Sequence, residues 1–136
     1  MKKLSYFLFF VSALILLVSF IVYLFFSKPI LVRDIYTSVN VTLDSGGFDL
    51  NGSALVFGKA TLGGSSTRSI IFTNNYSFPL ILKMDVNGTI SPMVFFEDDV
   101  IVNPHEMKKI YFSLVVPQDA QTGLYDGGIN IMARPL

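Results

Sequence analysis

The chain has 136 residues, with ten basic and ten acidic side chains and no cysteine. The lack of cysteine excludes disulfides, thiolate metal sites and cysteine nucleophiles. The balanced charge argues against a nucleic-acid-binding surface, which needs a clustered basic excess. Beyond the N-terminal segment about one hundred residues remain, the usual size of one small domain.

The N-terminal segment is apolar from Leu4 to Phe26, without a charge, glycine, proline or amide. As an α-helix it would be about 34 Å long, enough to cross a hydrocarbon layer of about 30 Å. A secretory signal has a shorter apolar core and a small-residue cleavage site, which residues 25–29 do not offer. We therefore expect an uncleaved anchor over residues 1–27, a short stalk over 28–34 and a domain over 35–136. A cleaved signal peptide is the alternative.

The charges that flank this segment predict its orientation. Lys2 and Lys3 precede it, whereas Lys28 and Arg33 follow it and are partly offset by Asp34. This bias favours a cytoplasmic N-terminus and an extracytoplasmic C-terminal domain on a single-pass protein of the cell membrane.

Glycosylation motifs agree with an exported domain. Four Asn-x-Ser/Thr motifs begin at Asn40, Asn51, Asn75 and Asn87. Each is a candidate glycosylation site, which would make the chain a glycoprotein. The alternative is chance, because these residue types are common in polar β-rich chains.

Three serines form a regular pattern within the anchor. Ser5, Ser12 and Ser19 recur every seven residues, which places them on one stripe of a helix. Small residues let membrane helices approach closely, so this stripe is a candidate packing surface for a neighbouring membrane helix. Ordinary scatter is the alternative, since a serine hydroxyl can bond its own helix backbone.

After the stalk, apolar and polar residues alternate with the period of two typical of half-buried strands. The expected strands cover residues 35–43, 54–58, 68–74, 80–86, 93–96, 100–102, 108–116 and 124–132. The pattern predicts an all-β fold, an antiparallel β-sandwich of about seven or eight strands preceded by one transmembrane α-helix. Leu82 and Phe112 lie in the most regular strands and are expected in the core.

A family resemblance rests on turn and packing motifs. These are Leu55-x-Phe57-Gly58, Arg68-x-Ile70-x-Phe72-x-Asn74, Val100-x-Val102-x-Pro104 and the tail Pro117-x-x-Ala120-x-x-Gly123-x-Tyr125-x-Gly127-x-Ile129. Together they resemble immunoglobulin-fold modules of the PapD-like and major-sperm-protein-like type. The resemblance implies an immunoglobulin-like sandwich used for protein–protein contact or as a spacer. The organisation also resembles archaellum stator-type accessory proteins, which join an N-terminal membrane helix to an outward β-sandwich.

Residues with catalytic or metal-binding chemistry are few. His105 is the only histidine and no Gly-x-Ser-x-Gly elbow is present, so a solvated turn histidine is expected. Calcium prefers oxygen ligands such as those of residues 97–99, or of Asp44, Asp49 and Asn51. Neither group has the spacing of a recognised calcium loop, so we expect solvated turns and no catalytic, cofactor or metal site.

These observations favour a non-enzymatic scaffold or accessory subunit that binds another membrane or cell-surface protein. Its expected partners are the lipid bilayer, that protein and further copies of itself. The alternative is a structural subunit of a pilus-like filament, although no Lys/Arg-Gly processing site precedes the apolar run. A small surface hydrolase is a third class, for which the sequence supplies no assembled catalytic set.

Overall fold

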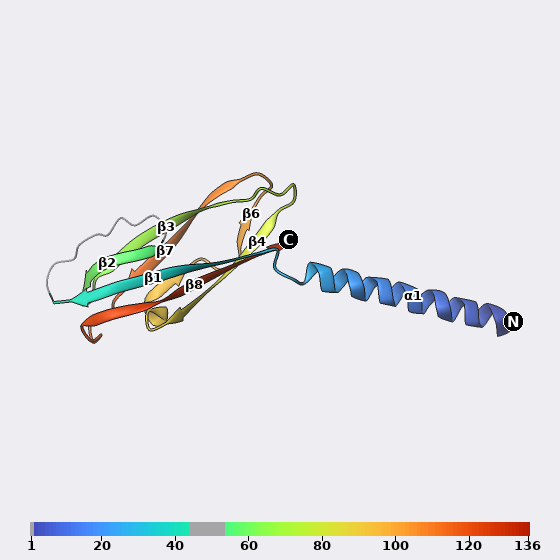
Figure 1. Ribbon diagram of the computed structural model, residues 1–136, viewed down its shortest axis with the longest axis horizontal. Helices are drawn as coiled ribbons and strands as arrows, with labels where there is room; N and C mark the ends of the chain where they lie inside the picture. Colours follow the sequence, from blue (N-terminus) through green and yellow to red (C-terminus); the bar gives the residue numbers. More distant parts are fainter. Residues whose placement is uncertain (1, 44–53) are drawn as a thin grey trace.

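The computed structural model describes residues 2–43 and 54–136, with side chains from residue 6 onward (Figure 1). The elements of these residues are α1 (Lys2–Phe26), β1 (Leu31–Thr42), β2 (Leu55–Thr61), β3 (Ser65–Thr73), β4 (Leu80–Gly88), a 3-10 turn (Ser91–Met93), β5 (Val94–Phe96), β6 (Val100–Val102), β7 (Met107–Val115) and β8 (Gly123–Pro135).

The helix α1 extends away from the β-strands (Figure 1), and its apolar side chains are almost all exposed. A helix that is apolar on every face has no polar side to turn toward water. Its surface is therefore suited to lipid or to other apolar helices.

The strands form two sheets that share one hydrophobic core. One sheet has five strands in the order β2-β1-β8-β4-β6, and the other has three in the order β3-β7-β5. All neighbours are antiparallel except β1 and β2, which are parallel. The expected antiparallel arrangement therefore holds for every pair except this one.

The strand β1 begins at Leu31, earlier than the start at residue 35 expected from the alternation. Residues 31–34 were expected in the stalk, but they pair with β8 in a ladder that starts at Leu31 and Ala133. The early start follows from the length of β8, which continues to Pro135 and supplies hydrogen-bond partners for these residues. The connection between α1 and the sheet is correspondingly short.

The core contains the inward-facing side chains of both sheets. Leu82 and Phe112 are fully buried, each with 0% of its surface exposed, as the alternation predicts. The other large, fully buried side chains include Phe57, Leu80, Ile90, Leu114, Ile129 and Ile131. The ring of Phe112 also lies 6.0 Å from that of Phe96, at an angle of 52°.

The strands β4 and β8 approach each other most closely where both contain glycine. A Cβ atom added to Gly127 would overlap the carbonyl oxygen of Asn87, and Gly88 has a positive φ of 85°. The strand β4 continues past residue 86, its expected end, to Asn87 and Gly88, which pair with Gly128 and Gly127. Glycine permits this contact because it has no Cβ.

Candidate functional site

The outer face of the three-stranded sheet carries large apolar side chains. Cross-strand partners share one face of a sheet, and the rows Ile71–Lys109, Ser69–Tyr111 and Phe95–Ser113 lie on the outside here. We call this surface the β3-β7-β5 face; its large exposed residues are Ile71, Phe95, Met107, Lys109, Tyr111 and Val115. Ile71, Phe95 and Tyr111 expose 64%, 56% and 57% of their surfaces.

A shallow depression lies at the β5–β7 side of this face. Its volume is about 300 Å³, and its lining includes Phe95, Lys109, Tyr111 and Ser113. The ammonium group of Lys109 lies 5.6 Å from the centre of the Tyr111 ring, within the range of a cation–π contact. Glu97 also lines it, so the depression combines aromatic surface with one positive charge, one negative charge and the hydroxyl groups of Tyr111 and Ser113.

The outer face of the five-stranded sheet carries polar rows together with exposed apolar side chains, among them Val32, Tyr36 and Leu124. It carries rows such as Asp34–Asn130–Asp85, in which the side-chain amide of Asn130 donates a hydrogen bond to Asp34. Lys83 on the same face lies 3.7 Å from Asp99, and both side chains are more than half exposed. Such an exposed ion pair contributes little stability.

Two of the candidate glycosylation sites lie on the outer face of the five-stranded sheet. Asn40 of β1 is exposed and pairs with Leu124, and Asn87 of β4 is exposed and pairs with Gly128. The Asn87 side-chain oxygen accepts a hydrogen bond from the Gly128 amide at 2.9 Å, which leaves its NH₂ group directed away from that bond. Asn75 is exposed in the loop between β3 and β4, and Asn51 lies outside the described residues.

The loop between β3 and β4 is organised by Asn74, a fully buried polar residue. Its side-chain NH₂ group donates to the carbonyl oxygens of Phe78, Val102 and Asn103 at 2.9, 3.1 and 3.0 Å. Its side-chain oxygen accepts a hydrogen bond from the Tyr76 amide at 2.9 Å. This one side chain therefore connects the β3–β4 loop to the β6–β7 loop.

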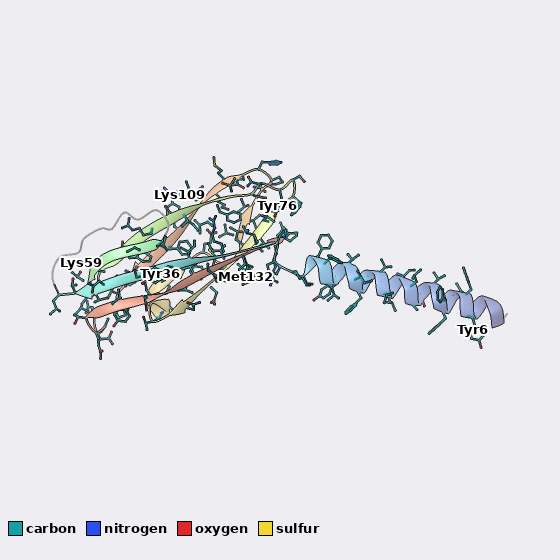
Figure 2. All side chains as sticks on the ribbon, viewed as in Figure 1. Tyr6, Tyr36, Lys59, Tyr76, Lys109 and Met132 are labelled. Carbon is teal, nitrogen blue, oxygen red and sulfur yellow. The ribbon has the colours of Figure 1, made fainter. Side chains whose placement is uncertain are left out.

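Asn74 also fixes the position of an aromatic pair. Tyr76 and Phe78 stack with ring centres 5.1 Å apart and an angle of 27° between the rings. Both side chains are partly exposed at the end of the sandwich next to α1, where Figure 2 labels Tyr76. The sequence predicted only that a strand ends at residue 74; an asparagine at the end of a strand, followed by turn residues, was the signal for a buried organising side chain.

Those candidate catalytic or calcium-binding residues that the structure describes lie in exposed turns. His105 is exposed, with a positive φ of 58°, in the turn between β6 and β7. Residues 97–99 are exposed between β5 and β6, whereas Asp44, Asp49 and Asn51 lie outside the described residues. Among the residues that the structure describes, no group of three or more His, Cys, Asp or Glu side chains is placed to hold a metal ion.

The serines of α1 are placed as the helical period requires. Ser12 and Ser19 are exposed on the helix, and the Ser12 hydroxyl donates a hydrogen bond to the carbonyl oxygen of Phe9 at 2.9 Å. This bond keeps the Ser12 donor within its own helix. The Ser5 side chain lies outside the described part of the chain.

Over the described ranges, one helix is long and apolar enough to cross a membrane, at Tyr6–Phe26. Its length, composition and position near the N-terminus fit a membrane anchor and also a signal sequence.

Comparison of the chain with models of known protein families, with curated proteins and with solved structures found no match. The class of the protein is therefore defined by its own structure: one N-terminal apolar helix followed by two β-sheets around a common core.

Proposed function

We propose that this chain is a membrane-anchored, extracytoplasmic, immunoglobulin-like scaffold or accessory subunit. It has no catalytic role and binds another cell-surface protein through the β3-β7-β5 face. α1 holds the protein in the bilayer, with the N-terminus in the cytoplasm.

Two features of the fold support an immunoglobulin-like domain. In that fold, strands B and E pair in one sheet while strands C and F pair in the other. Here β3 pairs with β7 in one sheet and β4 pairs with β8 in the other. In addition, the Tyr125 hydroxyl near the start of β8 donates to the carbonyl oxygen of Gln121 at 2.9 Å, as in the tyrosine corner at the start of strand F.

The first strand then occupies the position of the last one in an immunoglobulin domain. β1 is antiparallel to β8, beside the strand that corresponds to F, where strand G lies in that fold. The strand that leaves α1 is consequently hydrogen-bonded on both sides, to β8 and to β2. Such a strand makes a firm attachment between the helix and the domain.

The observation that carries the binding proposal is that the exposed apolar side chains of the β3-β7-β5 face lie away from two of the candidate glycosylation sites. The β3-β7-β5 face exposes Ile71, Phe95 and Tyr111, whereas Asn40 and Asn87 lie on the other sheet. Glycans at those two sites would cover the outer face of the five-stranded sheet and leave the β3-β7-β5 face open. Exposed aromatic and aliphatic side chains of this kind mark protein interfaces.

Charge supports the same assignment. Lys109 is the charged residue in the outward-facing paired rows of the β3-β7-β5 face. The other residues of these rows are serine, threonine, aromatic and aliphatic residues. A partner surface with apolar side chains around one carboxylate would complement it.

Site-specific photocrosslinking in the native membrane tests this function. A benzophenone amino acid is placed at Tyr111 or at Tyr36, exposed tyrosines of the two different sheets. Figure 2 labels Tyr36 on β1 and Lys109, the neighbour of Tyr111, on the three-stranded sheet. We expect a discrete heteromeric adduct from position 111, weaker adducts from position 36, and loss of the first adduct in an Ile71→Asp background.

Equal crosslinking from the two positions would contradict binding through the β3-β7-β5 face. A ladder of adducts made only of this chain would instead support the pilus-like filament and contradict the accessory role. Mass spectrometry of the adduct separates these results.

A further inference from the structure

The end of the sandwich next to α1 carries an exposed apolar rim. Ile30 and Leu31 lie where the chain from α1 enters the sandwich. The Ile30 amide donates a hydrogen bond to the Ala133 carbonyl oxygen at 2.8 Å. The Leu136 amide donates to the carbonyl oxygen of Pro79 at 3.1 Å, which brings the C-terminus beside the β3–β4 loop (Figure 1). We call this surface the α1-proximal rim; its residues are Ile30, Leu31, Tyr76, Phe78 and Leu136, which expose 37–65% of their surfaces.

The connection between α1 and this rim is short. Helical hydrogen bonding continues to Ser27, whose amide donates to the carbonyl oxygen of Tyr23 at 3.0 Å, and Ile30 is already bonded to β8. Lys28 and Pro29 alone separate these two bonded residues. Because an extended chain covers at most about 3.6 Å per residue, Ile30, the first residue of the rim, lies within roughly 11 Å of Ser27.

This distance places the start of the rim near the level of the lipid headgroups if α1 spans the membrane. The 21 residues of Tyr6–Phe26 give a helix of about 31 Å, which matches the hydrocarbon thickness. The headgroup region adds roughly 5–7 Å on each side. Ile30 therefore lies within the headgroup region or just beyond its outer boundary.

The chemistry of the rim suits that layer. Aromatic side chains concentrate at membrane–water interfaces, and tyrosine has both an apolar ring and a polar hydroxyl group. The hydrogen bonds of Asn74 hold the stacked Tyr76 and Phe78 in a defined loop. A fixed aromatic pair binds with less loss of conformational entropy than a mobile one.

The opposite end of the sandwich differs. The loop over residues 117–122 leads into the start of β8, which pairs with the end of β1 far from α1. This loop exposes Gln118, Asp119, Gln121 and Thr122. The stacked aromatic pair thus lies at the end next to α1, beside the polar β6–β7 loop, whereas the far end has this polar loop and the exposed Leu43 and Leu124.

We infer that the α1-proximal rim binds the headgroup region of the bilayer that holds α1, with Tyr76 and Phe78 as interfacial anchors. The inference rests on the proposed membrane anchorage. Its consequence is a sandwich with a restricted tilt on the membrane, in contrast to a domain that moves freely on a stalk. The orientation of the β3-β7-β5 face is then limited as well.

The absence of tryptophan from the chain provides a direct test. Single-tryptophan variants of the full-length protein, Phe78→Trp, Leu124→Trp and Phe20→Trp, are placed in phosphatidylcholine nanodiscs with or without bromine on the acyl chains near the headgroup. Leu124 is the matched control because it is an exposed apolar residue at the start of β8. Bromine quenches tryptophan only at short range, so loss of fluorescence reports contact with lipid.

We expect brominated lipid to quench Phe78→Trp and Phe20→Trp, and to leave Leu124→Trp unchanged. Quenching of Phe20→Trp with no more quenching of Phe78→Trp than of Leu124→Trp would overturn the rim inference and leave the anchor intact. Failure to quench Phe20→Trp would instead reject the membrane anchorage on which the inference rests. A blue-shifted but unquenched Phe78→Trp would show that protein covers the rim, which also overturns the inference.

Discussion

Replacing Asn74 with alanine should destabilise the domain. The substitution removes the donor for three carbonyl oxygens and the acceptor for the Tyr76 amide. Each intramolecular hydrogen bond contributes about 0.5–1.5 kcal/mol net, and the bond to Val102 is buried, so water does not replace it. The other three bonds are part-buried, so water replaces them at a smaller cost. The expected total loss is about 2–4 kcal/mol.

Urea unfolding of the full-length protein in a mild detergent, followed by circular dichroism, measures this loss. With a urea dependence of about 1–3 kcal/mol per molar, the midpoint for Asn74→Ala should fall by roughly 1–3 M. Asn75→Ala is the matched control, because Asn75 is exposed next to Asn74 and should change the free energy of unfolding by less than about 0.5 kcal/mol. Equal midpoints for the two variants would refute the assignment of Asn74 as the organising residue of both loops.

Three further predictions concern the core, the strand crossing and the helix. Phe112→Ala should lower the free energy of unfolding by about 3–5 kcal/mol in the same urea assay, and a loss under about 1 kcal/mol would contradict its burial. Gly127→Ala should lower it by at least about 2 kcal/mol, because the new Cβ meets the carbonyl oxygen of Asn87; an unchanged midpoint would contradict this close approach. Combined Ser12→Leu and Ser19→Leu should weaken helix association in a membrane two-hybrid assay, mainly through lost close packing, and unchanged association would identify the serines as ordinary scatter.

The alternation of apolar and polar residues was sufficient to predict most strands. The pattern that places Leu82 and Phe112 inward follows from the strand period alone, and both residues are buried. The same pattern placed Tyr111 outward, where an aromatic residue is a signal of binding that local alternation does not interpret.

Features that depend on distant residues were not predictable in this way. Arg33 and Asp34 read locally as part of a stalk, but they lie in β1 because the end of the chain pairs with them. The parallel contact of β1 with β2 likewise depends on how the two sheets close. Asn74 is polar by composition and becomes buried only because the β6–β7 loop supplies acceptors for its side chain.

The central claim is that α1 remains on the mature chain and that the sandwich lies outside the cell. Because the chain lacks cysteine, single-cysteine variants Lys59→Cys and Lys3→Cys can each be labelled with a membrane-impermeant maleimide on intact cells. Lys59 is exposed on β2, so its cysteine variant should react in intact cells, on a protein whose mass includes the residues of α1. Lys3→Cys should react only after permeabilisation. Protection of Lys59→Cys in intact cells, or a labelled protein that has lost α1, would contradict the account.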